Sequence, residues 1–524
     1  MIFPHPQVLR RIVSGHLCAF LFLNILSAQE IDSSIIISDF QYPYIHGIPI
    51  ILDETGENTF YLNERNPEFI SDGKINQVML DGALGIPLGS YFLPQILPKS
   101  SQADSVKNTS QIYYRKGDYV YSDLGIGLQI ESSDSGLFSF QGFKRSPPQL
   151  YQSSSDKNQL QNYLFSYSKD SENSNVAVST LYHIENYDLP VNRENTNRKV
   201  ESFHGGMGIE YRLGQLTFGS EQAFQFTYSN RWNDKVSYFT IWNTMNSTYQ
   251  FGRDFRVHLQ HHYKMHSTEI GNEVTDVPSQ IISSLIEYEK EGCSIQAGLS
   301  AYESSLQPIG TFNWKWNNYY LFAKRNYEVV FTQTEDYHTK VNPFSTDALA
   351  LGYKNKKIES EVELFHIQQE EKSSLGLKGK ANINLSWLDV RHTTGIYNLG
   401  SDNSSPQPVD MFSHTRIIFS PNVWPWKKAR FQPFIGLEST FVQHSGKMGI
   451  DPIKPEIIIP METVDPYSSF LVNMEYGLLI NQFKVSYRWV KFNMFGNTTN
   501  NSINPGSYSI LPIRHLEIVW QFWN

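Results

Sequence analysis

Three histidines on one side of a short segment are the first residues in this chain whose types and spacing could do chemistry. His258, His262 and His266 are four residues apart, and Arg256 and Lys264 alternate with them. Imidazoles grouped on one face suggest a metal site. In an extended strand, however, residues four apart lie about 13 Å from each other, too far for one ion to bind both. We therefore predict no metal site, and a polar surface in contact with water.

The other side of the same segment, residues 255–266, is apolar. It carries Phe255, Val257, Leu259, Tyr263 and Met265. Side chains of a β-strand alternate between two faces. The pattern is longer than the roughly 5–6 residues of an average strand and suits the roughly 9–11 residues of a strand that crosses a bilayer at a tilt. Because it recurs over most of the chain, we predict an all-β fold, a transmembrane antiparallel β-barrel.

A row of carboxylates and a row of amines form a second charged pattern. Glu359, Glu361 and Glu363 alternate with apolar residues, and Lys378 and Lys380 do so further along the chain. Carboxylate rows line cation paths in some pores. Opposite charges directly across a strand pair also stabilise a sheet, by about 0.2–1 kcal/mol. We predict local charge pairing as the main role of these residues.

The two charged rows share one face if their strands form a hairpin with the right turn. A turn centred between Glu371 and Lys372 satisfies this condition and places Glu363 opposite Lys380. We predict that this face lines the lumen of the barrel, as does the polar side of residues 255–266. The predicted lumen-lining residues are Arg256, His258, His262, Lys264, Glu359, Glu361, Glu363, Lys378 and Lys380.

Motifs of catalysis and cofactor binding give little support to an enzyme. Gly205-Gly-Met-Gly208 and Gly125-Ile-Gly127 lie within predicted strands, without the following helix that cradles a phosphate. The chain contains no Gly-x-Ser-x-Gly elbow and no HExxH motif. A serine and a histidine brought together across strands is the one catalytic arrangement that the sequence leaves open. We predict no catalytic residue, no cofactor and no metal.

The composition separates this chain from helical membrane proteins. Its 524 residues have a mean hydropathy of −0.39 and only 40% apolar residues, yet 14% are aromatic. A barrel with a polar interior, an apolar exterior and aromatic girdles at both interfaces has this mixture. A secreted soluble β-protein could share it, so composition alone does not decide between them.

The first 28 residues are typical of a secretory signal peptide. Arg10 and Arg11 precede a short apolar core that begins at Cys18, and Leu26-Ser-Ala28 is a small-residue cleavage site. Without them the chain has 41 basic and 52 acidic residues, which argues against nucleic acid as a partner. Cys293 is then the only cysteine, so no internal disulfide can form.

The mature chain has two predicted parts: a short N-terminal segment, residues 29–108, and a barrel, residues 109–524. The strand spacing accommodates roughly 16–22 strands, in the even-numbered range of bacterial barrels. Short turns on one rim and long loops on the other are expected. The predicted long loops are Asp188–Val200, Ile270–Pro278, Gly400–Asp410, Gly446–Pro466 and Asn497–Gly506.

The C-terminus resembles the closing strand of TonB-dependent receptor barrels. It follows Pro512 and ends in Trp520-Gln-Phe-Trp-Asn524, an aromatic-x-aromatic-aromatic-polar run. The resemblance implies that Leu516, Ile518, Trp520 and Phe522 face lipid. It also implies that the barrel-assembly machinery recognises this end of the chain.

Two N-terminal fragments point to the same family. Asp32–Asp39 resembles the short box that engages TonB, and Gln77–Leu88 with Leu93–Pro98 resembles part of the plug domain. Residues 29–108 are fewer than a complete plug of that family requires. The resemblance therefore implies a porin-like barrel of receptor ancestry with a short or vestigial plug, and TonB as an implied partner.

The sequence predicts an outer-membrane β-barrel of a diderm bacterium that mediates solute passage as a porin-like channel, with lipid around it. Two alternatives stay open: a TonB-coupled ligand uptake receptor, and a structural or adhesion barrel without transport. The solute is not identified by the sequence. A porin-like channel would select its solutes by the width of the pore, the charge of the lumen and the constriction formed by the loops.

Overall fold

The computed structural model describes most of the chain from Thr109 onward. The described residues are 109–118, 122–131, 136–146, 159–191, 194–231, 234–270, 273–333, 339–369, 372–385, 387–396, 399, 409–420, 431–444, 448–450, 458–460, 467–480, 483–490 and 513–523. The chain divides into two compact units, Met1–Asp39 and Phe40–Asn524, and every described residue belongs to the second. The predicted signal peptide and the segment 29–108 lie outside the described residues.

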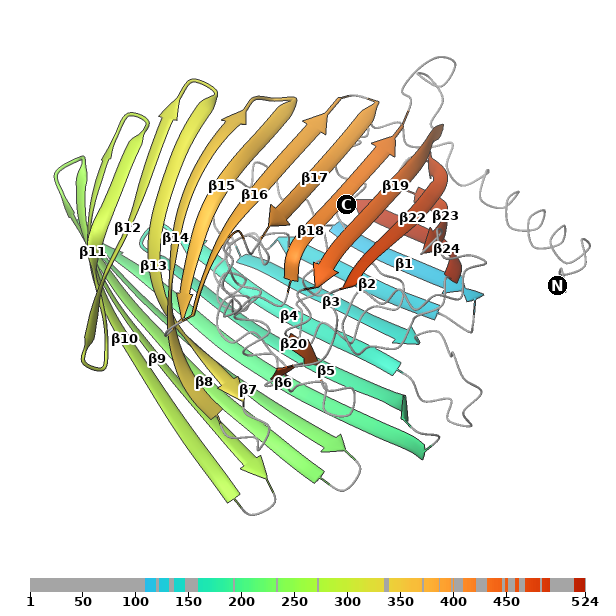
Figure 1. Ribbon diagram of the computed structural model, residues 1–524, viewed down its shortest axis with the longest axis horizontal. Coiled ribbons are helices and arrows are strands. Elements are labelled where there is room, and N and C mark those ends of the chain that lie inside the picture. Colours follow the sequence, from blue (N-terminus) through green and yellow to red (C-terminus); the bar gives the residue numbers. More distant parts are fainter. Residues whose placement is uncertain are drawn as a thin grey trace, which may run out of the picture. The chain divides into compact units, whose positions relative to one another are not determined.

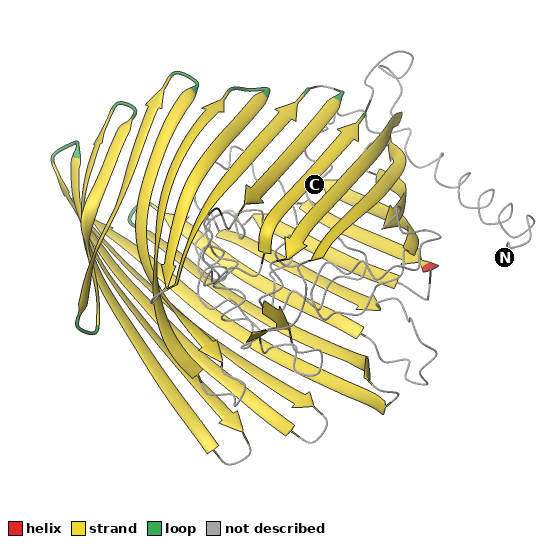
Figure 2. Ribbon diagram, in the orientation of Figure 1, coloured by secondary structure: helices red, strands yellow, loops and turns green. Residues whose placement is uncertain are grey.

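The described residues are almost entirely β-strand (Figure 2). The first twelve strands are β1 (Thr109–Gly117), β2 (Ser122–Glu131), β3 (Gly136–Ser146), β4 (Gln159–Ser171), β5 (Ser174–Val191), β6 (Glu194–Leu213), β7 (Leu216–Arg231), β8 (Asp234–Phe251), β9 (Phe255–Ile270), β10 (Glu273–Lys290), β11 (Cys293–Tyr302) and β12 (Ser305–Trp316). The others are β13 (Tyr319–Gln333), β14 (Thr339–Lys354), β15 (Ile358–Gln369), β16 (Lys372–Asn384), β17 (Leu388–Ile396), β18 (Val409–Phe419), β19 (Phe431–His444), β20 (Met448–Ile450), β21 (Ile458–Pro460), β22 (Tyr467–Ile480), β23 (Phe483–Val490) and β24 (Ile513–Trp523). Among the described residues, no helix has the length and apolar character needed to span a membrane.

One antiparallel sheet of 22 strands contains all of these strands except β20 and β21, which form a small hairpin of their own. Each strand pairs with its neighbours in the chain, and the last strand, β24, pairs with the first, β1, from Trp523–Thr109 to His515–Gly117 (Figure 1). The sheet therefore closes on itself, as a membrane requires of a β-structure, and each of its strands pairs with a neighbour on both sides over at least part of its length. The predicted all-β barrel is confirmed, and its strand number lies at the upper end of the predicted range.

The two faces of the sheet have opposite chemistry. In β10, Ile282 and Ile286 are exposed, whereas Ser279, Ser283 and Glu287 are buried. In this strand the apolar side chains point outward and the polar side chains point inward. This arrangement is the reverse of that in a soluble β-sheet and is typical of transmembrane barrels. We call the side with the exposed apolar residues the apolar face and the other side the polar face.

The closing strand follows the same alternation. Leu516 and Trp520 are exposed on the apolar face, and His515 and Glu517 are buried on the polar face. The predicted orientation of Leu516 and Trp520 agrees with this placement. The side chain of Phe522 lies outside the described residues.

The connections between strands differ at the two rims. The longest, residues 147–158, 397–408, 445–466 and 491–512, all follow strands that run in the same direction and so lie at one rim. The other rim has mostly short turns, several of two residues, such as 214–215 and 291–292. Gly214, Gly252 and Gly292 adopt positive φ in these turns, a backbone conformation that tight hairpins need.

Two predicted long loops are wrong. Within Asp188–Val200, β5 continues to Val191 and β6 begins at Glu194. Within Ile270–Pro278, β9 ends at Ile270 and β10 begins at Glu273. Both segments are polar. Because strand pairing satisfies the backbone N–H and C=O groups whatever the side chains are, the strands of these hairpins continue through polar sequence. The predicted loop Gly400–Asp410 falls between β17 and β18, Gly446–Pro466 contains the β20–β21 hairpin, and Asn497–Gly506 lies outside the described residues.

Replacing Leu259 by arginine is expected to destabilise the folded barrel by about 2–4 kcal/mol, because Leu259 lies on the apolar face and a cation at the lipid midplane costs that much. Leu259 is 50% exposed, so the effect of the arginine is expected to come from its charge more than from its size. The measurement is equilibrium unfolding of the refolded protein in lipid vesicles. Gln260→Arg, one residue along on the polar face, is the matched control. A larger loss of stability in Gln260→Arg would show that the faces are assigned the wrong way round, and equal stability would show that neither position differs in its exposure to lipid.

Candidate functional site: the polar face of the barrel wall

The structure places the four predicted residues of β9 on one face. Arg256, His258, His262 and Lys264 are alternate residues of the strand, and each lies across from a polar-face residue of β10 in the register. Arg256 Nη1 is 2.9 Å from Glu289 Oε2 and 3.4 Å from Glu287 Oε2. Arg256 therefore acts as a charge partner of carboxylates on the next strand.

His258 belongs to a line of hydrogen bonds that crosses several strands. Its Nδ1 is 2.9 Å from Thr248 Oγ1 on β8, and its Nε2 is 2.7 Å from Glu287 Oε2 on β10. Glu287 also hydrogen-bonds to Gln296 on β11. Thr311 on β12 in turn donates to Gln296 Oε1 at 3.0 Å. Five neighbouring strands are thus linked by side chains as well as by their backbones.

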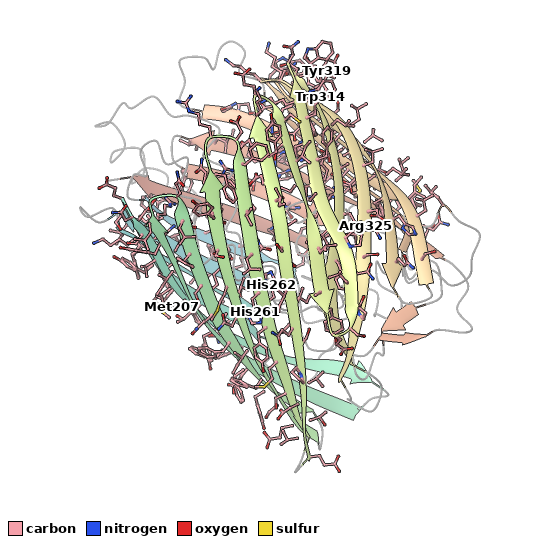
Figure 3. All side chains as sticks on the ribbon, turned by 90° about the vertical axis from the view of Figure 1, so that its left-hand side faces the viewer. Met207, His261, His262, Trp314, Tyr319 and Arg325 are labelled. Atoms are coloured by element: carbon pink, nitrogen blue, oxygen red, sulfur yellow. The ribbon has the colours of Figure 1, made fainter. Side chains whose placement is uncertain are left out.

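His262 makes a separate contact and does not join His258. Its Nδ1 is 3.1 Å from Thr244 Oγ1 on β8. His261, the next residue, points to the apolar face and lies 2.9 Å from Gln280 Nε2. Figure 3 labels both histidines on the wall formed by these strands. Among the described residues, no group of three or more histidine, cysteine or acidic side chains is placed to hold a metal ion.

The charged hairpin of β15 and β16 has the predicted shared face, but its register differs from the prediction. Glu363 lies opposite Lys378, not Lys380, and Glu361 lies opposite Lys380. The turn is centred one residue earlier than predicted, which shifts the pairing by two positions. Because side chains alternate with a period of two, this shift leaves every residue on its predicted face.

Contacts around this hairpin confirm that its charges are paired. Glu359 lies between two lysines: its Oε2 is 3.5 Å from Lys354 Nζ, and its Oε1 is 3.5 Å from Lys380 Nζ. Tyr320 on β13 donates a hydrogen bond of 2.5 Å to Glu361 Oε2. Glu363 and Lys378, which are cross-strand neighbours, are both buried. The carboxylate row is therefore held by neighbours on both sides.

Among the described residues, a group of buried charges lies where the sheet closes, and it was not predicted from the sequence. Lys484 Nζ on β23 is 2.7 Å from Glu517 Oε1 on β24 and 2.7 Å from Glu475 Oε1 on β22. Arg115 on β1 pairs with the other oxygen of Glu517. The side chains of Arg115, Lys484 and Glu517 are 9%, 13% and 5% exposed. We call these four residues the closure network.

A second pair of charges extends this group along the wall. Arg488 Nη2 on β23 is 2.6 Å from Glu438 Oε2 on β19, two strands away. The alternation of apolar Phe483, Val485, Tyr487 and Trp489 could have placed Lys484 and Arg488 on the polar face. Their partners could not be predicted from the sequence, because Glu438, Glu475 and Glu517 come from three different strands that only the folded sheet brings beside β23.

The fold and these two faces define the class of protein. A closed sheet of 22 strands, with an apolar exposed face and a polar face of paired charges, has the architecture of a transmembrane β-barrel. No protein-family model matches the chain, and no curated protein matches it in sequence.

Solved structures with a similar fold come from outer-membrane transport proteins. The FrpB iron transporter from Neisseria meningitidis (F5-1 variant) has a TM-score of 0.59 and 10% identity, over 79% of this chain and 82% of that chain. The ferric yersiniabactin uptake receptor FyuA from Yersinia pestis has a TM-score of 0.56 and 8% identity, over 80% of this chain and 81% of that one. The siderophore receptor PiuA from Acinetobacter baumannii has a TM-score of 0.56 and 7% identity, over 80% of this chain and 82% of that one. At these identities the likeness shows a shared fold.

Proposed function

We propose that this chain is an outer-membrane receptor that takes up a ligand through a plugged barrel, with energy supplied through TonB. The observation that carries the proposal is the strand number. Barrels of roughly 16–18 strands leave an aqueous channel, whereas 22-stranded outer-membrane transporters have a plugged lumen. This sheet has 22 strands and is closed by the pairing of β24 with β1.

The polar face lines the lumen in this proposal. Its residues include the predicted set on β9, β15 and β16 and the closure network. Paired carboxylates and cations, such as His258 with Glu287 and Lys380 with Glu359, give a hydrated wall with no excess of one charge at these places. Such a wall tolerates water and a polar solute without selecting strongly for either sign.

The N-terminal part of the chain supplies the plug and the coupling in this proposal. Residues 1–28 direct export, and residues 29–108 occupy the lumen or its periplasmic mouth. The segment Asp32–Asp39 is the TonB-binding box, as its resemblance implies. The aromatic end of β24 is the signal for the barrel-assembly machinery. These assignments support a location in the outer membrane of a diderm bacterium.

A porin-like channel is the second candidate. It is favoured by the paired charges on β9, β10, β15 and β16, because such side chains suit a wall in contact with water. In this reading residues 29–108 narrow the lumen without sealing it. The two candidates differ in whether the intact protein conducts ions.

Single-channel conductance distinguishes the two candidates. The refolded mature chain, residues 29–524, is expected to show little conductance of potassium chloride in a planar bilayer, and a variant without residues 29–108 is expected to show large open-channel steps. Large steps from the intact protein would support the porin-like channel. Equal and low conductance of both proteins would contradict both candidates and leave a structural barrel.

Cysteine labelling tests the plug itself. In a Cys293→Ser background, single cysteines at Met79 and Leu93 are expected to be protected from a membrane-impermeant reagent added on the periplasmic side. The same reagent should label a cysteine at Ser71 if the turn Ser71–Gly73 is accessible. Full labelling at all three positions would show that this segment is a linker and not a plug.

A further inference from the structure

The barrel wall opens locally between β12 and β13. Within residues 293–333, β12 pairs with β13 only over Gly310–Trp316, opposite Tyr319–Arg325. The rest of β12, residues 305–309, pairs with β11 alone, and β13 continues to Gln333 paired only with β14. The backbone ladder between these two strands therefore ends at Arg325, although both strands continue.

A cleft of about 350 Å³ occupies this opening. It is lined on one side by the end of the β11–β12 hairpin and on the other by β13, β14 and β15. The lining side chains that matter here are Ser305, Gln307, Arg325, Tyr327, Ser345 and Gln368. We call it the β12–β13 cleft.

The two sides of the β12–β13 cleft come from opposite faces of the sheet. In the register, Gln307 lies on the polar face with Ser300 and Ser283, whereas Arg325 lies on the apolar face with the exposed Leu349 and Leu351 of β14. A cleft between such residues forms only if the end of the β11–β12 hairpin overlaps the apolar face of β13–β15. The hairpin end therefore lies outside the adjoining wall, and the cleft opens outward.

One side-chain hydrogen bond joins β12 to β13 across the cleft. Gln307 Nε2 donates to Ser305 Oγ at 3.1 Å, and Ser305 hydrogen-bonds to Tyr327 on β13. The positive φ of 50° at Glu303 shapes the tight turn at the end of the hairpin. These contacts hold the hairpin end against β13 without closing the space between them.

Charged residues lie beside the cleft on the apolar face, where they are unexpected. Arg325, Asp347 and His366 are cross-strand neighbours on β13, β14 and β15. Arg325 Nε is 3.7 Å from Asp347 Oδ1, and His366 Nδ1 is 3.7 Å from Asp347 Oδ2, with all three side chains about 40% exposed. An arginine that faces lipid at mid-depth costs about 2–4 kcal/mol. A polar ligand over this group would remove that cost.

The cleft runs from Arg325, inside the apolar band, toward the rim with the long connections. Figure 3 shows Trp314 and Tyr319 at one end of the wall and Arg325 part of the way along it. Arg325 is six residues beyond Tyr319, about 20 Å along the strand and about 15 Å in height at a usual barrel tilt. The hairpin end at Glu303–Ser304 lies further toward the opposite rim, the rim with the long connections.

We propose that the β12–β13 cleft binds a sugar ring. Its lining offers hydroxyl and amide groups, which both donate and accept hydrogen bonds, as sugar hydroxyls require. Arg325 and Glu303 carry opposite charges, so the cleft is not specialised for an anion or a cation. Tyr327 adds an aromatic ring against which the apolar side of a sugar can pack. The sugar is either the headgroup of an outer-leaflet glycolipid or a free saccharide.

Binding to the protein in phospholipid nanodiscs tests this proposal. Two probes are used: lipid A, detected by native mass spectrometry of the nanodisc complex, and free glucosamine, detected by calorimetry. Binding of either probe is expected to weaken about tenfold in Gln307→Leu and in Arg325→Leu, the loss of about one hydrogen bond to a polar ligand. Arg212→Leu is the matched control, because Arg212 is similarly exposed and also pairs with one carboxylate, Glu210.

The outcomes separate the possible occupants. Lipid A binding without glucosamine binding would identify the glycolipid headgroup, and glucosamine binding would identify a soluble sugar. Failure of both probes to bind, or equal weakening in Arg212→Leu, would overturn the proposal. A concentration-dependent dimer that is lost in Arg325→Leu would also overturn it, because the cleft would then be a contact between two copies of this chain. Retained heat-modifiable migration on gels shows that each variant is folded.

Discussion

Replacing Glu517 by leucine is expected to lower the free energy of unfolding by about 3–5 kcal/mol, the usual cost of removing one partner of a buried ion pair. Glu517 is 4% exposed and is shared by Arg115 and Lys484 on its two neighbouring strands. Without this carboxylate, two buried cations from β1 and β23 face each other across β24. The measurement is denaturant unfolding of the refolded barrel, followed by tryptophan fluorescence.

A surface carboxylate provides the comparison. Glu210→Leu removes the partner of Arg212, an exposed pair at 2.8 Å, and is expected to cost no more than about 1 kcal/mol. A double variant, Arg115→Met and Glu517→Leu, is expected to recover part of the lost stability, because it removes one of the two cations while Lys484 keeps Glu475 as its partner. If Glu517→Leu were as stable as Glu210→Leu, the closure network would not hold the two ends of the sheet together.

Removing residues 521–524 is expected to abolish assembly of the barrel in the outer membrane. Gln521, Phe522 and Trp523 pair with the first three residues of β1 in the register. Their loss leaves three residues of β1 with an unpaired edge at the rim of the barrel, in or near lipid, where unsatisfied backbone groups each cost several kcal/mol. The measurement is heat-modifiable migration and protease resistance of the protein in isolated outer membranes.

The double variant Phe522→Ala, Trp523→Ala separates two effects of that deletion. It keeps the backbone pairing but removes the aromatic side chains that the assembly machinery is expected to recognise. Assembly of the double variant together with failure of the deletion would assign the defect to strand pairing. Normal assembly of the deletion itself would mean that β24 is not needed to close the sheet.

Alternation of side chains carried most of what the sequence could predict. It placed Arg256, His258 and Glu359 on one face and Leu259 on the other, because the two faces of a strand repeat with a period of two. A register shift of two residues leaves every side chain on the same face, so the alternation cannot detect it. For this reason the sequence predicted Lys380 opposite Glu363, where the structure has Lys378. Local pattern thus fixes the face of a residue but not its partner.

The polar segments between strands show a second limit of the sequence. Asp188–Val200 has the composition of a loop, yet most of it belongs to β5 and β6. A strand outside the bilayer can be polar on both faces, because its backbone bonds are made within the hairpin and its side chains are in water. The composition of a segment indicates whether lipid or water surrounds it. Composition distinguishes a strand from a loop only where the segment lies inside the membrane.

The sequence by itself determined the all-β barrel and the faces of its strands, since both depend on residues near one another in the chain. The resemblance of the C-terminal residues to a closing strand implied their role in closure. The tertiary structure alone decided the number of 22 strands, the closure network and the β12–β13 cleft. Arg115 and Glu517 are 402 residues apart and meet only when the last strand pairs with the first. The cleft forms because the hydrogen-bond ladder between β12 and β13 ends early. No residue pattern within either strand predicts where that ladder ends.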